Sequence, residues 1–385
     1  MKNEKKKKTV VLALSGGIDS SLCAYLLKEQ KFNVICVFIK CWDATLNSDI
    51  LGNMGVSDEK GCHDVKDYKN AKQVADSLNL QLVTFNFVEE YWNLVFQHFL
   101  EDIKNGYTPN PDIDCNSIVK FDLFIKKAIK LYNPDFIATG HYAKIKKTDN
   151  GIFLQQAEDK SKDQSYFLAS IKEHQLEKII FPLENIYKKD IKNFLLQSNV
   201  NVNLNQKSSS GICFIGKRNF KNFLTNYFPI KPGKIIDIKT NQVLKEKHDG
   251  YYFYTIGQRK GLKLGGYGEK HFIVKKNIHK NILYVAGINE KKYLLSSGFS
   301  AKKMHLINKI NEQKDLINAT FDAVLRYQSK RIKIKITEYN QQTKKIKILF
   351  NDLQPSVTPG QFCVFYQDTT CIGCCQVDDV LYNEE

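Results

Sequence analysis

The chain has 385 residues, enough for about two or three domains of ordinary size, which excludes a small scaffold that depends on disulfides. It carries 57 lysines and arginines against 41 aspartates and glutamates, so its formal net charge is +16. This surplus favours contact with a polyanion such as RNA, DNA or an anionic membrane, although a lysine-rich composition alone gives the same charge. No apolar run approaches the roughly 18 residues of a membrane-spanning helix, and the basic start Met1–Lys8 leaves no room for a targeting segment. We therefore expect a cytoplasmic protein with no membrane partner.

The first half of the chain alternates strand-like and helix-like segments. This alternation predicts an α/β domain, a doubly wound parallel sheet with helices on both faces. Apolar residues recur at helical spacing at Ala71, Val74, Ala75 and Leu78, and again at Ile118, Phe121, Ile125 and Ala128. The predicted strands are Thr9–Leu14, Asn33–Ile39, Gln81–Phe85 and Asp135–Thr139, and the first predicted helix is Ser21–Gln30.

After about Phe220 the pattern changes to short β-rich runs. Turn pairs separate them, as in all-β modules: Pro232-Gly233, Gly265-Gly266 and Pro359-Gly360. Arg331–Thr337 and Lys344–Phe350 alternate apolar and polar residues, as barrel or sandwich strands do. The second half is therefore expected to hold a β-rich middle domain and a C-terminal β-barrel.

The segment Ser15–Ser20, with the sequence Ser-Gly-Gly-Ile-Asp-Ser, joins the first predicted strand to the first predicted helix. Two glycines let backbone N–H groups approach an anion, and the helix start adds positive potential. Asp19 is suited to orienting the loop or holding Mg²⁺. The patterns of kinase-type P-loops and dinucleotide folds are missing. A phosphate cradle is predicted, with an ordinary Gly-Gly turn as the alternative.

Two further segments contain cysteines with possible chemistry. Thr108–Asn116 contains two prolines and is predicted to be a rigid, extended loop ahead of a helix from Ser117, so that Cys115 lies beside a helix N-terminus and gains thiolate character. Asp112 is a candidate acid or base, or else a residue that caps the helix or braces the loop. Cys213 lies in Gly211–Gly216 between apolar residues, where a cysteine is usually structural.

Taken in order, S-G-G-I-D-S, T-P-N-P-D-x-x-C-N and G-I-C-F-I-G resemble the tRNA-specific 2-thiouridylases, members of the ATP pyrophosphatase (PP-loop) superfamily. Further similar segments are Thr139–Ala143, Lys162–Leu168, Gly257–Leu262 and Pro359–Gln361. The resemblance implies an adenine nucleotide alpha hydrolase-like domain, then a small middle domain and a C-terminal barrel. The predicted boundaries are 1–218, 219–284 and 285–385.

The same resemblance implies an activity. ATP, with Mg²⁺, adenylates the C2 oxygen of the tRNA wobble uridine, and sulfur from a cysteine persulfide replaces that oxygen. Cys213 carries the persulfide and Cys115 is the partner nucleophile, which either liberates sulfide or forms a disulfide with Cys213. The fold must then bring these two thiols together. The sulfur comes from a partner protein, a cysteine desulfurase or a sulfur relay protein.

The resemblance also assigns binding residues. The nucleotide-site positions are Ala13, Leu14, Ser15, Gly16, Gly17, Ile18, Asp19, Ser20, Ile39 and Gly140. The tRNA positions are Asn110, Pro111, Asp112, His141, Lys162, Asp163, Gln164, Arg326, Tyr327 and Gln361. No metal site is predicted, because Cys371, Cys374 and Cys375 lack a second cysteine pair at zinc spacing.

The chain departs from the family pattern at two places. Ser208-Ser209-Ser210 stands where the family usually has Asp-Ser-Thr, and Asn47–Lys60 is an enlarged polar segment with no derived role. Three alternatives also stay open: an amidating or ligating enzyme with the same loop, a non-catalytic RNA-binding protein, and a thiol oxidoreductase. The first predicts that Cys115 and Cys213 are dispensable, and the second predicts no ATP consumption with tRNA.

Overall fold

The computed structural model describes residues 7–43, 63–198, 200–205, 213, 215, 219–265, 267, 269–308, 316–317 and 319–382. It divides into two compact units. The first comprises Met1–Phe96, Pro111–Asn219 and Thr369–Ile372, and the second comprises Gln97–Asn110, Phe220–Asp368 and Gly373–Glu385. Both the predicted middle domain and the predicted barrel fall almost entirely in the second unit.

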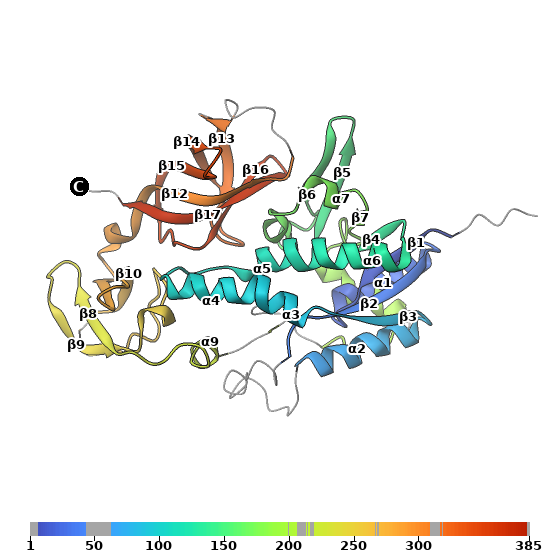
Figure 1. Cartoon of the computed structure of the whole chain (residues 1–385), viewed down its shortest axis with the longest axis horizontal. Coiled ribbons are helices and arrows are strands. Elements are labelled where there is room, and N and C mark those ends of the chain that lie inside the picture. Colours follow the sequence, from blue (N-terminus) through green and yellow to red (C-terminus); the bar gives the residue numbers. More distant parts are fainter. Residues whose placement is uncertain are drawn as a thin grey trace, which may run out of the picture. The chain divides into compact units, whose positions relative to one another are not determined.

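The first unit is built on a five-stranded parallel sheet (Figure 1), with strand order β3-β2-β1-β4-β7. The four predicted strands are confirmed, and each of their ends lies within one residue of the predicted position. Because the order reverses beside β1, the loops that follow β1 and β4 meet at the carboxyl edge of the sheet, where α/β proteins bind ligands. The strands are β1 (Thr9–Ala13), β2 (Asn33–Lys40), β3 (Gln81–Asn86), β4 (Phe136–Ala138) and β7 (Ile179–Ile180).

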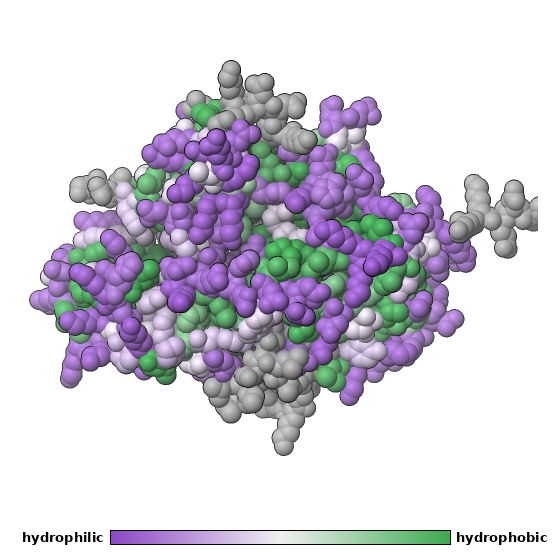
Figure 2. Space-filling model, in the orientation of Figure 1, coloured by the Kyte–Doolittle hydropathy of each residue, from purple (hydrophilic) through white to green (hydrophobic). Residues whose placement is uncertain are grey.

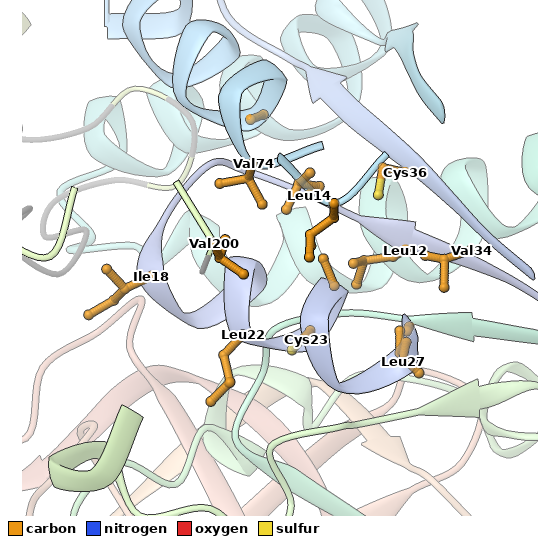
Figure 3. Packing of buried hydrophobic residues seen from close by; sticks show 14 of the residues in the cluster. Leu12, Leu14, Ile18, Leu22, Cys23, Leu27, Val34, Cys36, Val74 and Val200 are labelled. Atoms are coloured by element: carbon orange, nitrogen blue, oxygen red, sulfur yellow. The ribbon is translucent and has the colours of Figure 1, made fainter. Parts of the chain in front are cut away.

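Helices cover both faces of this sheet. One core cluster joins β1 and β2 to α1 (Ile18–Glu29), α2 (His63–Ser77) and α8 (Ile191–Gln197). In Figure 3, Leu12 of β1 and Leu14, just after that strand, lie beside α1, which carries Leu22 and Cys23. On the other face, Phe85 of β3 contacts the ring of Phe124 in α6 (Phe124–Tyr132), with ring centroids 6.0 Å apart. Burial of both faces explains why these strands are continuous apolar runs.

The segment Thr108–Asn116 differs from the prediction. It is extended only up to Asn110, because α5 (Pro111–Asp114) begins at the second proline and runs into a π-helix, η3 (Cys115–Leu123), and then into α6. Proline is tolerated in a first helical turn because the missing N–H has no partner there anyway. Cys115 therefore lies inside a long helical segment and not at its N-terminus. The first helix also begins earlier than predicted, at Ile18.

The remaining elements of the first unit are short. They are α3 (Val88–Tyr91), the π-helix η2 (Trp92–Phe96), β5 (Ala143–Thr148), β6 (Gly151–Gln156), η4 (Ser165–Leu168), α7 (Glu173–Leu176) and η5 (Lys188–Asp190). The antiparallel hairpin of β5 and β6 pairs with Thr370 at the start of β17 through Gln155.

The second unit contains the predicted barrel. Six strands close on themselves in the order β12-β15-β14-β13-β16-β17, because β12 also pairs with β17. A separate sheet has the order β10-β11-β8-β9. The bounds are α4 (Gln97–Lys104), α9 (Phe220–Leu224), β8 (Gly233–Asp237), β9 (Val243–His248), η6 (Tyr251–Phe253), β10 (His271–Asn277), β11 (Ile282–Gly287), η7 (Lys291–Leu294), β12 (Leu295–Leu306), β13 (Thr320–Val324), β14 (Ile332–Asn340), β15 (Lys345–Pro355), β16 (Phe362–Gln367) and β17 (Thr370–Tyr382).

Hydrophilic side chains cover much of the face shown in Figure 2, with smaller hydrophobic areas between them. None of the helices in the described part of the chain is long and apolar enough to span a membrane.

Replacing Leu22 by alanine is expected to lower the free energy of unfolding of the first unit by about 2–5 kcal/mol, because Leu22 is fully buried in the core of α1 and the sheet. Both tryptophans of the chain, Trp42 and Trp92, belong to this unit, so their fluorescence during urea unfolding reports on it. The matched control is Leu131→Ala at a position that is 55% exposed, with an expected change below about 0.5 kcal/mol. Equal effects of the two changes would contradict the described core.

Candidate functional site

The segment Ser15–Ser20, which joins β1 to α1 and is called the phosphate loop below, is shaped by its serines. The Ser15 and Ser20 hydroxyl oxygens lie 3.1 Å apart, and Ser20 Oγ donates to the Gly17 carbonyl at 3.0 Å. Ser21 Oγ donates to the same carbonyl at 2.9 Å. These bonds fix the turn before any ligand binds, so the loop is already held in a tight conformation.

Two glycines allow other backbone segments to approach this loop. Gly16 has φ +79°, and a Cβ there would lie 2.6 Å from the Asp67 carbonyl oxygen and the Ala71 nitrogen. A Cβ on Gly140, just after β4, would lie 3.2 Å from the Ser20 nitrogen. A side chain at either position would crowd a neighbouring backbone segment, so the packing around this loop needs glycine at both. Of the other predicted nucleotide residues, Leu14, Ile18 and Ile39 are buried and Ala13 is partly buried at the same edge of the sheet.

Asp19 is held from two sides. Its Oδ1 accepts a hydrogen bond from the Tyr142 hydroxyl at 3.0 Å and forms an ion pair with the Lys188 ammonium group. Sequence reasoning missed Lys188, because it lies 169 residues from Asp19 and no motif distinguishes it from the other lysines. It also lines an open pocket of about 420 Å³ together with Lys162. The pocket therefore connects a predicted tRNA residue with a side chain that contacts the phosphate loop.

The second centre of the first unit is a pair of thiols. Cys115 of η3 donates a hydrogen bond to the sulfur of Cys213, so residues 98 positions apart in the chain meet. The Cys213 backbone is anchored as well, because its N–H donates to Asp112 Oδ1 at 2.8 Å and its carbonyl accepts from the Tyr91 hydroxyl at 3.1 Å. Cys115 is fully buried, whereas Cys213 is partly exposed.

The pKa values of the two thiols shift in opposite directions. The hydrogen bond from Cys115, together with the nearby Lys120 ammonium group, lowers the pKa of Cys213. Burial raises the pKa of Cys115, and so does its bond to Cys213. The prediction that Cys115 gains thiolate character from a helix N-terminus is therefore wrong, because Cys115 is buried within a helix. Cys213 is therefore the more acidic thiol of the pair, and the more acidic thiol forms the nucleophilic thiolate more readily.

Asp112 braces the Cys213 backbone, and burial raises the pKa of its carboxyl group. A raised carboxyl pKa favours the protonated form that a general acid needs, and the bond to the Cys213 N–H braces the loop.

His141 connects the two centres. It follows Gly140, whose backbone lies against the phosphate loop, and its ring faces the Lys120 charge. Burial and that charge lower the pKa of His141 far below its ordinary value, so the ring is neutral. Thr139 Oγ1 lies 2.8 Å from His141 Nδ1 and fixes the ring orientation.

The other predicted tRNA residues of the first unit differ in their freedom to bind. Lys162 is exposed, but Asp163 is buried and accepts bonds from Ala157 N–H and Ser165 Oγ at 3.0 and 2.7 Å. Gln164 Oε1 accepts from the Tyr142 N–H at 3.0 Å. Asp163 and Gln164 therefore shape the loop that presents Lys162.

In the second unit, Arg326 and Gln361 line one cavity of about 220 Å³ in the barrel, with Lys330 beside them. The Arg326 guanidinium donates to Thr358 Oγ1 at 2.7 Å. Tyr327, next in the chain, is partly exposed, and so is Asn110. The Asn47–Lys60 segment, the triplet Ser208–Ser210 and all of Gly211–Gly216 except Cys213 and Ile215 lie outside the described residues.

Three family models match successive parts of the chain. They are described as a tRNA methyl transferase HUP domain (residues 8–217), a tRNA methyl transferase PRC-barrel domain (221–287) and an aminomethyltransferase beta-barrel domain (296–377).

Curated relatives match over nearly the full length, and the two described next are both named tRNA-specific 2-thiouridylase MnmA. The protein of Mycoplasmopsis synoviae is 43% identical over 99% of this chain and 98% of its own length. That of Metamycoplasma arthritidis is 44% identical over 98% of both chains. The thiol pair, the phosphate loop and these matches together show that the chain belongs to the tRNA-specific 2-thiouridylase family.

Proposed function

We propose that this chain is an ATP-dependent tRNA sulfurtransferase that converts the wobble uridine of certain tRNAs into 2-thiouridine. One observation carries the proposal. The loop after β4 touches the phosphate loop through Gly140 and faces the thiol centre through His141, so an activating site and a sulfur site share one edge of the sheet. Neither of the rival enzyme classes needs that combination.

Activation comes first, because the C2 oxygen of uracil is a poor leaving group. ATP bound at Ser15–Ser20 would transfer AMP to that oxygen and release pyrophosphate, and AMP is a good leaving group. Backbone N–H groups of the loop and the α1 N-terminus would stabilise the phosphates. Asp19 would hold Mg²⁺, since that ion binds through one or two carboxylates plus substrate phosphates. Lys188 would then turn from Asp19 to the phosphates.

Sulfur delivery uses the thiol pair. The Cys213 thiolate attacks the outer sulfur of a donor persulfide, a new S–S bond forms on Cys213, and the donor leaves as a thiolate. In one route this sulfur bonds to C2, and Cys115 then attacks the Cys213 sulfur, so that a disulfide forms as AMP departs. In the other route Cys115 attacks first and liberates sulfide. The contact between the two thiols supports both routes.

The substrate fits the charge of the chain, since a net +16 favours a polyanion. Pro111 and Asp112 lie next to the thiol centre and would hold the flipped base. Lys162 and the cavity of Arg326 and Gln361 offer contacts for phosphates and bases. The donor would be a cysteine desulfurase or a sulfur relay protein, and the reaction would take place in the cytoplasm.

Cys213→Ser is expected to lower thiolation by about three orders of magnitude or more, because it removes the atom that carries sulfur. The assay combines protein, ATP, Mg²⁺, a persulfide donor and unmodified tRNA, and detects 2-thiouridine in the digested tRNA by mass spectrometry. The control Cys36→Ala removes a buried thiol of β2 and should retain activity. Undiminished thiolation by Cys213→Ser would refute the persulfide role of this residue, whereas no 2-thiouridine from the unmodified protein would favour a ligating enzyme.

Asp19→Ala is expected to abolish tRNA-dependent formation of AMP and pyrophosphate while Cys213 still acquires a persulfide. The reason is that Asp19 belongs to the phosphate loop and makes no contact with the thiol pair in the part of the chain that the structure describes. AMP is measured by chromatography and the persulfide by mass spectrometry of the Cys213 peptide. Loss of both signals in a folded Asp19→Ala variant would show that the two centres are not separable. If the unmodified chain binds tRNA but consumes no ATP, a non-catalytic RNA-binding protein is favoured.

A further inference from the structure

Lys120 is a cation that the sequence patterns did not single out. It lies five residues after Cys115 in the π-helix η3. A π-helix bonds residue i to residue i+5, and Phe124 N–H bonds the Val119 carbonyl in this way at its C-terminal end. Cys115 and Lys120 therefore lie one turn apart and on nearly the same face, whereas ordinary α-helical spacing would carry Lys120 further round the helix.

The Lys120 side chain reaches the thiol centre. Its ammonium group hydrogen-bonds the Cys213 sulfur and interacts with Cys115 and Asp112. The side chain is partly buried, so solvent screens its charge less than it would screen that of a surface lysine. The surrounding groups favour the ammonium form, because the raising effects of Cys213, Cys115 and Asp112 outweigh the burial that lowers the pKa of Lys120.

The balance of charge around Cys213 depends on this lysine. His141 is neutral, and Tyr91 stays protonated because burial raises its pKa. Asp112 opposes a thiolate, while the Cys115 S–H supports it as a neutral donor. Within the described ranges of the chain, the titratable groups that face the sulfur are Cys41, Tyr91, Asp112, Cys115 and Lys120, with His141 behind Lys120. Among these, Lys120 supplies the positive charge.

We propose that Lys120 is a catalytic residue of the sulfur site, whose ammonium group holds the Cys213 sulfur as a thiolate and then holds the persulfide anion that replaces it. This rests on the proposed function, since a persulfide on Cys213 belongs to that function. The π-helical register of η3 exists, on this account, to place Lys120 and Cys115 against the same sulfur. π-Helical turns are frequent at functional sites for this kind of reason.

Lys120 serves the transfer of sulfur from a donor persulfide to Cys213. The Cys213 thiolate attacks the outer sulfur of a persulfide R–S–SH, the donor S–S bond breaks, and R–S⁻ leaves with the electron pair of that bond. The Cys213 persulfide loses its proton to solvent, and its terminal sulfur then carries the negative charge that had been on the thiolate. Lys120 neutralises one negative charge before and after the transfer and remains protonated throughout.

The test is the pH dependence of Cys213 alkylation by iodoacetamide, followed at the Cys213 peptide by mass spectrometry. Cys213 is partly exposed, while the other eight cysteines in the described part of the chain are buried, so its rate is measured separately. The unmodified protein should show its inflection below that of a free thiol. In Lys120→Met and Lys120→Gln the inflection should move upward, and the rate at pH 7 should fall about tenfold or more, as expected when a nearby opposite charge is lost.

Two variants exclude a merely structural effect. Lys120→Arg keeps the charge and should keep the low inflection, and Lys130→Met removes an exposed lysine of α6 and should change nothing. If both neutral variants fold, judged by an unchanged unfolding midpoint, and still alkylate with the unmodified pH profile, the proposal is wrong. If Lys120→Met does not fold, Lys120→Gln and Lys120→Arg decide between the two results.

This measurement needs neither ATP nor tRNA, so it is independent of the proposed function. A Lys120-dependent thiolate in a protein that makes no 2-thiouridine would count against the function alone. If the protein thiolates tRNA normally but the pH profile of Cys213 alkylation is unchanged in the neutral Lys120 variants, only the role of Lys120 is refuted. A second readout, transfer of sulfur from glutathione persulfide to Cys213, should slow by a similar factor in the neutral variants.

Discussion

Negative charge on a partly buried sulfur is favourable only when neighbouring groups stabilise it, and the site around Cys213 depends on this constraint. Cys213 receives a hydrogen bond from Cys115 and lies beside the Lys120 ammonium group, while Asp112 and Tyr91 fix its backbone from opposite sides. Neighbouring groups therefore stabilise both negative charge on this sulfur and the backbone of Cys213.

The sheet supplies the second half of the chemistry. Because the strand order reverses beside β1, the loops after β1 and β4 lie next to one another, and Gly140 lets them come close. The phosphate loop is held in a tight turn by its own serines, and Asp19 is held by Tyr142 and Lys188. A loop that is ordered before ATP arrives loses less entropy on binding. In the proposed function, the adjacent residues Gly140 and His141 would connect the activating site with the thiol centre.

Much of the fold was predictable from the sequence. The strands of the first unit were found because buried parallel strands are continuous apolar runs, and β14 and β15 were found because barrel strands alternate. The tight turn after the first strand was predictable because two glycines and flanking serines follow an apolar run. The pairing of Cys115 with Cys213 came from family resemblance, since no local pattern joins residues so far apart.

The errors have physical reasons. Two prolines suggest an extended loop that ends just before Cys115, but Pro111 lies in a first helical turn. The lowered thiol pKa that was expected for Cys115 is therefore found at Cys213. Lys120 was missed because only the π-helical register brings it beside Cys115. Lys188 was missed because its partner Asp19 is distant in sequence. In each case the deciding contact is tertiary, or depends on a helical register that periodicity does not reveal.

The most direct test of the central claim follows one sulfur atom. Cys213 is loaded with ³⁵S from a labelled persulfide, free donor is removed, and unmodified tRNA is added with or without ATP in a single turnover. The account predicts that the label leaves the protein and appears in 2-thiouridine in near-equal amount, and that it does so only with ATP. Thiolation of the tRNA while the label remains on Cys213 would contradict it.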